Sequence, residues 1–287
     1  MDVTTLDATT NPLDAALALL RDLPALSPGF VGRMRALADD GVSIATLAAG
    51  VEPDPVLTLR LLRVANSPFF GMSRRVDSVR DAITVLGLLN ARSLIVAGCV
   101  MNQLKPDAVS GFDAARYWRH SLACAAASEC LALRTGLPAP RAFLAGIVHD
   151  IGDLALAQLW PERYRDVGAA RGAGAVDMFA LEGEHYGFDH AELGARLVEH
   201  WRFPADLCRA VAGHHGARQW DADLPADTLR LVGTLRFGNA WADWTARDDN
   251  AGREPPPELA ELAGDDLASL APRIERRLEM LIGMVRE

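Results

Sequence analysis

Seven polar residues of this sequence are of the types from which metal centres are built. They are His120, His149, Asp150, His190, His214, His215 and Asn239. His149 and Asp150 stand together at the end of an apolar stretch, which places two side chains that are costly to bury at the edge of a core. Imidazole nitrogen and carboxylate oxygen suit zinc, iron, manganese or nickel. A carboxylate that bridges two ions would permit a two-metal centre of the kind that hydrolyses phosphate esters.

Five candidates fall on five different predicted helices, so helix packing could bring one side chain from each helix to a common point. They are His120, His149, His190, His214 and Asn239. Asp189 is a predicted N-cap, which places His190 in the first turn of a helix, where the helix dipole favours the neutral imidazole that binds metals. Asn239 occupies a helical position where an acidic residue would have completed the set.

Each candidate also has a purely structural interpretation. Asp150 could cap the next helical turn while His149 bonds to a carbonyl, and one member of the His214-His215 doublet must point away from any single target. A single histidine on a helix is more often structural or exposed. On this ground His185 and His200 are left out of the candidate site.

The spacing of apolar residues predicts helices, and no alternating strand pattern occurs, so we expect an all-α fold. In the second half of the chain the predicted helices span about 113–135, 139–150, 176–184, 189–201, 204–215, 226–246 and 265–286. An exposed linker is expected at Gly252–Pro257, where glycine and proline gather.

In the first half, helical spacing occurs at Leu13–Leu23 and at Phe30–Asp39. Asp54 is a predicted N-cap before a helix that runs to Asn66, and Ser78 opens a sequence that resembles a capping box. The polar stretch Lys105–Ser110 is a predicted hinge. These features predict a flexible leader (1–12), an N-terminal helical lobe (13–105) and a second helical lobe with a C-terminal helical extension (106–287).

The composition excludes two classes of partner. The chain has 287 residues, of which 50% are hydrophobic, so a large core is available. The formal net charge is −9 and Lys105 is the only lysine, so we expect no nucleic-acid partner. The longest purely apolar run, Leu94–Met101, is too short for a hydrocarbon core that needs roughly 20 apolar residues, so we expect no membrane span.

The cysteines Cys99, Cys124, Cys130 and Cys208 form no CxxC pair. The sequence shows no signal-peptide pattern, so we expect reduced thiols and a cytoplasmic protein.

The segment from Leu23 to about Ala217 resembles the HDOD family, bacterial domains related to the HD and HD-GYP metal-dependent phosphohydrolases. The matching stretches are Leu23–Pro28, Leu61–Gly71, Ala82–Gly87, Trp118–Ser121, Ala145–Gly152 and Gly187–Gly194. The resemblance implies a two-lobed multi-helical bundle with an HD-like helical lobe on its C-terminal side.

By similarity to the catalytic HD-GYP relatives, the implied metal ligands are His120, His149, Asp150, His190, His214 and His215. They would hold one or two ions of iron, manganese or zinc, and no organic cofactor is implied. Two features depart from the catalytic pattern. Asn239 replaces the closing aspartate, and Gly216–Asp221 stands where a Gly-Tyr-Pro motif would follow the histidine doublet.

Three functions are open at this point, in order of preference. The first is a signal-transduction output module that binds a signalling protein or a small effector and does not catalyse efficiently. The second is a metal-dependent phosphohydrolase of a cyclic dinucleotide or other nucleotide, in which Asp150 would be the catalytic residue. The third is a sensor that reports oxygen or redox state through iron in the site.

Overall fold

The computed structural model describes residues 11–20, 41–72, 74–103, 112–172, 178–216, 223–246, 255–264 and 267–285. Within these ranges the regular structure is helical and no strand occurs, which confirms the all-α prediction. The predicted helix at Phe30–Asp39, the hinge at Lys105–Ser110 and residues 1–10 of the leader lie outside the described residues, as do residues 252–254 of the linker.

The helices divide into three groups along the chain. Near the N-terminus lie α1 (Pro12–Leu20), α3 (Ile44–Val51), α4 (Pro55–Ala65), the 3-10 turn η3 (Pro68–Phe70), α5 (Val79–Leu86) and α6 (Leu88–Gln103). The central group is α7 (Ala114–Thr135), α8 (Ala139–Val148), α9 (Ile151–Leu159), α10 (Pro161–Gly172), α11 (Met178–Tyr186), α12 (His190–His200), α13 (Ala205–Ala212) and α14 (Ala226–Thr245). The chain ends with α15 (Pro257–Ala263) and α16 (Leu267–Val285).

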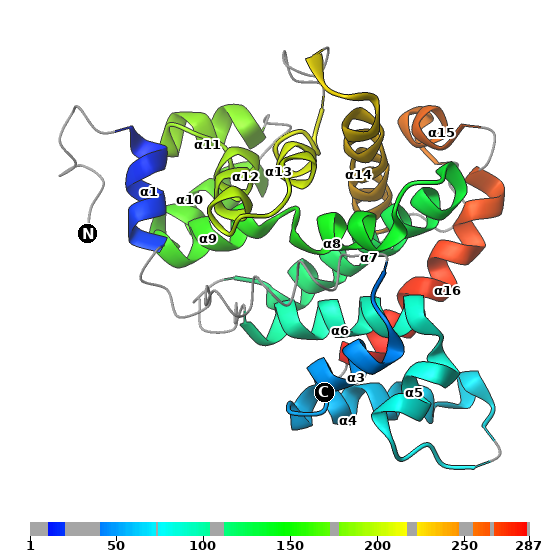
Figure 1. Cartoon of the computed structure of the whole chain (residues 1–287). Helices are drawn as coiled ribbons and strands as arrows, with labels where there is room; N and C mark the ends of the chain where they lie inside the picture. The colour runs from blue at the N-terminus through cyan, green and yellow to red at the C-terminus, as the bar shows by residue number, and fades with distance from the viewer. Residues whose placement is uncertain are drawn as a thin grey trace.

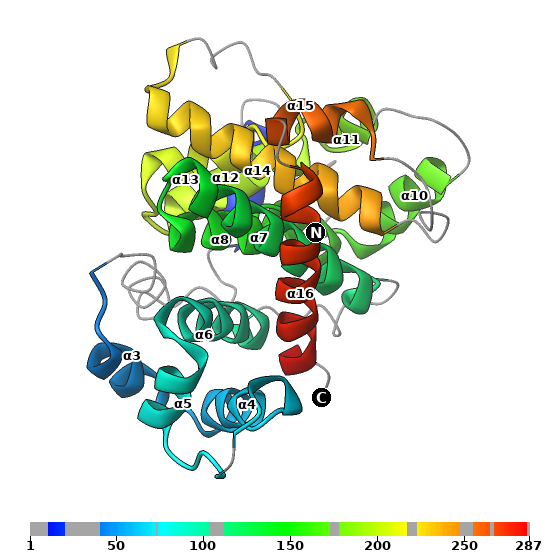
Figure 2. The same cartoon turned by 90° about the vertical axis from the view of Figure 1, so that its right-hand side faces the viewer.

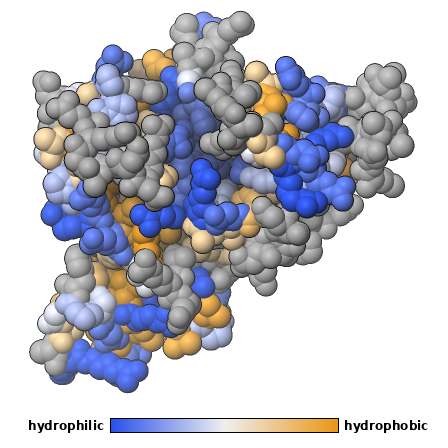
Figure 3. Space-filling view, turned by 180° about the vertical axis from the view of Figure 1, so that it is seen from behind, coloured by the Kyte–Doolittle hydropathy of each residue, from blue (hydrophilic) through white to orange (hydrophobic). Residues whose placement is uncertain are grey.

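Helices α3, α4 and α5 form one end of the molecule, and α9 to α14 form the other (Figure 1). Long helix α7 packs against α8, α14 and α16, so it is the central helix of the larger part. Helix α16 runs from the level of α15 down to α4 and contacts both parts, as Figure 2 shows. Seen from behind, hydrophobic residues are visible between the upper and lower parts of the molecule (Figure 3).

Short polar side chains start several helices as the sequence predicts. The Asp54 carboxylate accepts hydrogen bonds from the amides of Val56 and Leu57, and Ser78 Oγ accepts one from the amide of Asp81. Asp189 and Glu192 form a complete capping box at the start of α12. The N-caps at Asp54, Ser78 and Asp189 are therefore confirmed, and the complete capping box is observed at Asp189, whereas at Ser78 the hydroxyl instead donates to the Asp81 carboxylate.

Other helical boundaries differ from the predictions. Helix α8 ends at Val148, so the expected helix 139–150 is too long by two residues. Helices α9, α10 and α15 were not predicted, and α15 begins at Pro257, the last residue of the expected linker. Helix α1, the first helix of the N-terminal group, packs on α9 and α12 of the central group.

A buried charged cluster joins α6, α7 and α16, and we call it the Glu129–Arg277 cluster. Arg277 Nε donates to the Glu129 carboxylate, and Arg277 Nη1 donates to Asn90 Oδ1 at 2.7 Å. Ser93 Oγ donates to the other carboxylate oxygen of Glu129. Glu129 and Arg277 are 1% and 9% exposed, so their opposite charges neutralise each other away from water.

Among the described helices, one stretch, Ala139–Leu159, is long and apolar enough to cross a membrane by composition alone. It comprises α8, the turn after it and α9, and 78% of its apolar window is buried inside the protein. Helices α5 and α6 pass the same test only as a pair, which is bent by 117°. This burial is expected of core helices.

Candidate metal centre

The candidate side chains converge although they come from five separate places in the fold. His120 lies on α7, His190 is the first residue of α12 and Asn239 lies on α14. The pair His149-Asp150 forms the turn between α8 and α9, and the doublet His214-His215 follows α13. Two groups of possible ligand atoms result, each with its atoms within 4.8 Å of one another, and Asp150 belongs to both groups. We call the whole set the metal-ligand cluster.

Glycine permits the helix contact that places Asp150. A Cβ atom at Gly152 would overlap the backbone carbonyl oxygen of His190 and lie 2.8 Å from the amide nitrogen of Gly194. Only glycine therefore lets the start of α9 approach α12 so closely. This approach carries Asp150, two residues earlier, to the first turn of α12 and thus to His190.

A second close contact places Asn239. A Cβ atom at Gly238 would overlap Ser128 Oγ and lie 2.6 Å from the carbonyl oxygen of Cys124, both on α7. The missing side chain allows α14 to lie directly against α7. Asn239, the next residue, consequently reaches His120 on the same face of α7, where its Oδ1 lies 3.0 Å from His120 Nε2.

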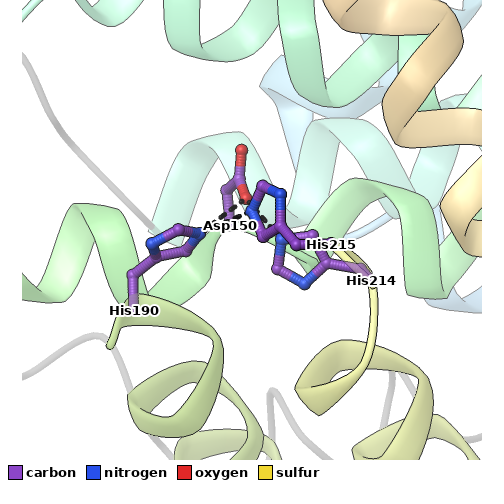
Figure 4. Close-up of side chains that lie close together, drawn as sticks. All are labelled: Asp150, His190, His214 and His215. Carbon is purple, nitrogen blue, oxygen red and sulfur yellow. Dashed lines mark hydrogen bonds and ion pairs between the residues drawn. The ribbon is translucent and has the colours of Figure 1, made fainter. Parts of the chain in front are cut away.

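Asp150 divides the cluster, because its two carboxylate oxygens face different histidines. Oδ2 lies 3.3 Å from His120 Nε2 and 3.2 Å from His149 Nε2. Oδ1 lies 3.2 Å from His214 Nε2 and 3.8 Å from His190 Nε2. Figure 4 shows Asp150 between His190 on one side and the His214-His215 doublet on the other. One carboxylate with histidines at each oxygen has the arrangement of a bridging ligand.

The ring protons of two histidines are fixed by backbone carbonyls. His149 Nδ1 donates to the carbonyl of Gly146 at 2.8 Å, and His214 Nδ1 donates to the carbonyl of Val211 at 2.6 Å. This leaves Nε2 of each ring directed into the cluster, as in metal-bound histidines. His214 Nε2 and Asp150 Oδ1 are both buried and have no hydrogen-bond partner, so two electron-pair donors face each other across 3.2 Å.

A cation is the chemical group that such a gap fits. Buried acceptors without partners are rare, and each costs about 1–3 kcal/mol when left unpaired. A metal ion would accept both electron pairs at once, and neutral imidazole with carboxylate is a common donor set for zinc, iron and manganese. The residues present therefore fit a metal ion.

Glu182 is a functional candidate that the sequence did not reveal. Its Oε2 accepts from His190 Nδ1 at 2.7 Å and from the His190 amide at 2.8 Å, and the side chain is 1% exposed. A carboxylate behind a ligating histidine orients the ring and makes it more basic. The only signal in the sequence is an acidic residue on the preceding helix, which is common on any helix surface.

The pKa values follow from burial and from these pairs. Burial opposes the charge on Asp150, but the positive charge of the adjacent His149 ring holds the pKa of this carboxyl well below its usual range. Burial lowers the pKa of His120, lowers that of His214 to about 4 and also lowers that of His215. These three rings are consequently neutral near pH 7 and have the form that binds metals.

Two histidines behave differently because a carboxylate holds a proton on each of them. Burial opposes protonation, but Asp150 raises the pKa of His149 well above its usual value, and Glu182 raises that of His190 to about 9. A metal ion must therefore displace protons from these two rings when it binds.

The arrangement bears on the two interpretations of several residues. Asp150 is the N-cap residue of α9 through its backbone carbonyl, but its side chain makes no cap bond and faces the cluster. His149 does bond to a carbonyl, but through Nδ1, while Nε2 faces the cluster. Both members of the His214-His215 doublet reach the cluster, and His185 and His200, which we set aside, belong to neither group of possible ligands.

A cavity of about 410 Å³ opens onto the cluster. Its walls include His120, Asp150, His190, His215 and Asn239. Aromatic and acidic side chains complete the lining, among them Phe112, Tyr117, Asp153, Tyr164, Phe179, Tyr186 and Asp243. Burial raises the pKa of Asp153 to about 6, and its carboxylate accepts a hydrogen bond from Tyr164. A cavity of this size accommodates a small organic molecule.

Comparison with known proteins identifies similar sequences and folds. The model of the HDOD domain matches residues 23–217, which are the residues that carry the resemblance seen in the sequence. A relative in Treponema pallidum (strain Nichols), named “Uncharacterized protein”, is 23% identical over 237 residues. These residues are 80% of this chain but only 44% of that protein, so the chain spans less than half of its relative's length.

Three crystal structures are similar over nearly the whole chain. A “Putative phosphohydrolase” from Shewanella amazonensis SB2B is 27% identical with a TM-score of 0.72, and the match covers 94% of this chain and 98% of that one. An HDOD domain protein with unknown function from Geobacter sulfurreducens is 23% identical, with a TM-score of 0.69 and coverage of 96% and 97%. A “Putative signal transduction protein” from Marinobacter aquaeolei VT8 is 22% identical, with a TM-score of 0.70 and coverage of 100% and 69%. The last two show the fold alone.

Proposed function

Since the chain belongs to the HDOD family, we propose that it is a regulatory output module that holds metal in its HD-type cluster and acts by binding a signalling protein or a small effector. The observation that carries this proposal is the unpaired contact between Asp150 Oδ1 and His214 Nε2. A buried carboxylate oxygen that meets the lone pair of a neutral ring is poorly satisfied without a cation.

Two ion positions follow from the two groups of ligands. His190, His214 and His215 with Asp150 would hold one ion, and His120 and His149 with Asp150 would hold the other. The first position has three histidines and the second has two. Asn239 offers the second position only an amide oxygen, so we expect the ion there to bind more weakly.

Weak catalysis is part of the proposal for the same reason. Asn239 brings no charge to the place where a carboxylate would strengthen the second ion position. Its amide bonds instead to both halves of the cluster, through Oδ1 to His120 Nε2 at 3.0 Å and through Nδ2 to His215 Nδ1 at 3.3 Å. A module of this kind would use the ions to stabilise a binding-competent conformation or to hold a ligand.

A metal-dependent phosphohydrolase is the second candidate, and the cavity favours it. Asp150 and His120 face a space that could admit a nucleotide, and a similar structure has phosphohydrolase in its name. The ions, when bound, would lower the pKa of a water molecule and polarise a phosphoryl oxygen. Asp150 would hold the two positions together, and the buried carboxylate of Glu182 would keep His190 in its ligating orientation.

Elemental analysis of the native purified chain tests the proposal. We expect at least one tightly bound iron, manganese or zinc ion per chain, and loss of that metal in Asp150→Ala. His200→Ala is the matched control, because His200 is exposed and outside both ligand groups, and it should retain the metal. Absence of metal from the wild-type protein, after incubation with each ion and desalting, would overturn the proposal.

Turnover separates the two candidate functions. The wild-type protein loaded with metal is incubated with cyclic dinucleotides and with mononucleotides. Hydrolysis at enzymatic rates that disappears in Asp150→Ala would replace the regulatory module with the phosphohydrolase. Metal binding without turnover supports the regulatory module.

A further inference from the structure

The cavity beside the metal-ligand cluster has an uneven distribution of charge. Among the described residues that line it, five are carboxylates, namely Asp113, Asp150, Asp153, Glu182 and Asp243. Of the described lining residues, Arg116 is the one arginine and none is a lysine. The Arg116 side chain is exposed, and no salt bridge to a described carboxylate neutralises it. Its charge is therefore available to a ligand.

The position of Arg116 on α7 places it one helical turn from the metal-ligand cluster. Arg116 precedes His120 by four residues, so the two side chains lie on one face of the helix, one turn apart, about 5–6 Å between Cβ atoms. Asp113 and Tyr117 line the cavity from the same helical face. The Asp113 carboxylate accepts from the Arg116 amide at 2.9 Å, which fixes this first turn of α7.

Tyr117 supplies an independent observation. It is 6% exposed and lines the cavity, and its buried hydroxyl has no hydrogen-bond partner. Burial, together with Asp150 and Asp153, raises the pKa of Tyr117 well above its usual value. The hydroxyl therefore stays protonated and can donate a hydrogen bond. The Tyr117 hydroxyl is a buried donor without a partner, and the neighbouring Arg116 forms no salt bridge with a described carboxylate. The two together are suited to binding an anion.

We propose that Arg116 and Tyr117 form an anion-binding position next to the metal-ligand cluster, which holds a phosphate group of a small phosphorylated ligand. This inference rests on the proposed function, because it identifies the class of ligand that the module takes. Arginine matches two phosphate oxygens with its planar fork, and the tyrosine hydroxyl adds a third donor. The cavity, at about 410 Å³, exceeds what phosphate alone would fill, so the ligand is a phosphorylated organic molecule.

Calorimetric titration with inorganic phosphate tests this position. The full-length protein is loaded with manganese and compared with Arg116→Gln and with Tyr117→Phe. We expect Arg116→Gln to weaken phosphate binding by about tenfold or more, the loss typical of a charge-assisted hydrogen bond. Tyr117→Phe should weaken it by a smaller factor, about fivefold, because it removes one neutral donor.

Two variants separate a local contact from a general effect of charge. Arg119→Gln removes the same charge from an exposed residue of α7 that does not line the cavity, and it should leave phosphate binding unchanged. Arg116→Lys keeps the charge without the planar fork and should retain part of the affinity. Equal losses in Arg116→Gln and Arg119→Gln would overturn the proposal, as would unchanged binding in Arg116→Gln.

Metal content measured on the same samples separates this inference from the proposed function. If every variant keeps its manganese and only Arg116→Gln and Tyr117→Phe lose phosphate affinity, both stand. If the protein binds manganese but the wild-type protein and Arg116→Gln have the same phosphate affinity, this inference alone fails. If the wild-type protein binds no metal, the proposed function fails, and titration of the metal-free protein still decides whether phosphate affinity depends on Arg116.

Discussion

Two buried polar clusters of this protein differ in how completely their members satisfy one another. In the Glu129–Arg277 cluster a carboxylate meets donors, and both of its oxygens are bonded. In the metal-ligand cluster the Asp150 carboxylate meets the lone pair of a neutral ring, and neither atom has a hydrogen-bond partner. Arg277 Nη2 has no partner in the first cluster, but every oxygen of its carboxylate meets a donor, whereas the second cluster leaves two acceptors facing each other that a cation would satisfy. Burial alone therefore does not distinguish a structural site from a binding site, whereas the pattern of donors and acceptors does.

The largest expected effect comes from breaking the complete cluster. Glu129→Gln leaves the Arg277 charge buried beside a neutral amide. A guanidinium cannot lose its proton, so this charge stays unpaired. We expect the free energy of unfolding to fall by about 3–5 kcal/mol. Urea denaturation of the metal-free protein at constant pH measures this change.

Asp150→Asn in the same metal-free protein sharpens the contrast. It leaves His149 without its carboxylate, but an imidazole can release its proton and become neutral. The loss of stability should therefore be clearly smaller than for Glu129→Gln. A loss for Asp150→Asn as large as that for Glu129→Gln would contradict this contrast.

A second prediction concerns Glu182, the carboxylate that bonds to the candidate metal ligand His190. Glu182→Gln replaces the buried carboxylate behind His190 with an amide, which orients the ring less firmly and makes it less basic. Metal affinity should fall by about 10–100-fold. The measurement is the metal concentration at which thermal unfolding shifts upward, since an ion that binds only the folded state stabilises it.

Glu184→Gln is the control for Glu182→Gln, because Glu184 lies on the same helix α11 and is exposed. It removes the same charge without touching His190. Equal metal affinity in the wild-type protein and in Glu182→Gln would show that this carboxylate is not coupled to the ligand.

The sequence predicted those features that depend on residues near each other in the chain. The caps at Asp54, Ser78 and Asp189 need only partners two or three residues away, and they formed as expected. The choice of ligand candidates followed from residue type and from the family resemblance. The convergence of His120 with Asn239, 119 residues apart, depends on the helix contact at Gly238, which no local pattern encodes.

The features that the sequence did not predict have several physical causes. Helix α10 has a polar composition without a clear apolar face, so periodicity did not reveal it. Helix α9 follows α8 after a turn of two residues, and the predicted helix 139–150 covers only the first of the two helices. Glu182 and Tyr117 owe their roles to burial and to missing or specific partners, which only the assembled fold determines.

The smallest expected effect is a change in the difference in metal affinity between the two ion positions of the metal-ligand cluster. Asn239→Asp tests it. Asn239 Oδ1 faces His120 Nε2, and Asn239 Nδ2 faces His215 Nδ1. His215 Nε2 is directed at His190 Nε2, 2.9 Å away, so it is the nitrogen that an ion would meet. An aspartate at 239 would accept a proton from His215 Nδ1 and so keep Nε2 free for an ion.

Asn239→Asp should therefore strengthen both ion positions, and the weaker one more. It adds a carboxylate beside His120, so we expect about tenfold tighter binding there, which corresponds to about 1.4 kcal/mol. A calorimetric metal titration should show two unequal steps in the wild-type protein that move closer together in the variant.

Asp243→Asn is the control for charge alone, because Asp243 lies 3.8 Å from His120 Nδ1 and is half-exposed. If Asp243→Asn lowers the affinity as much as Asn239→Asp raises it, the effect is general electrostatics. If neither variant changes the steps, the amide at 239 does not cause the inequality.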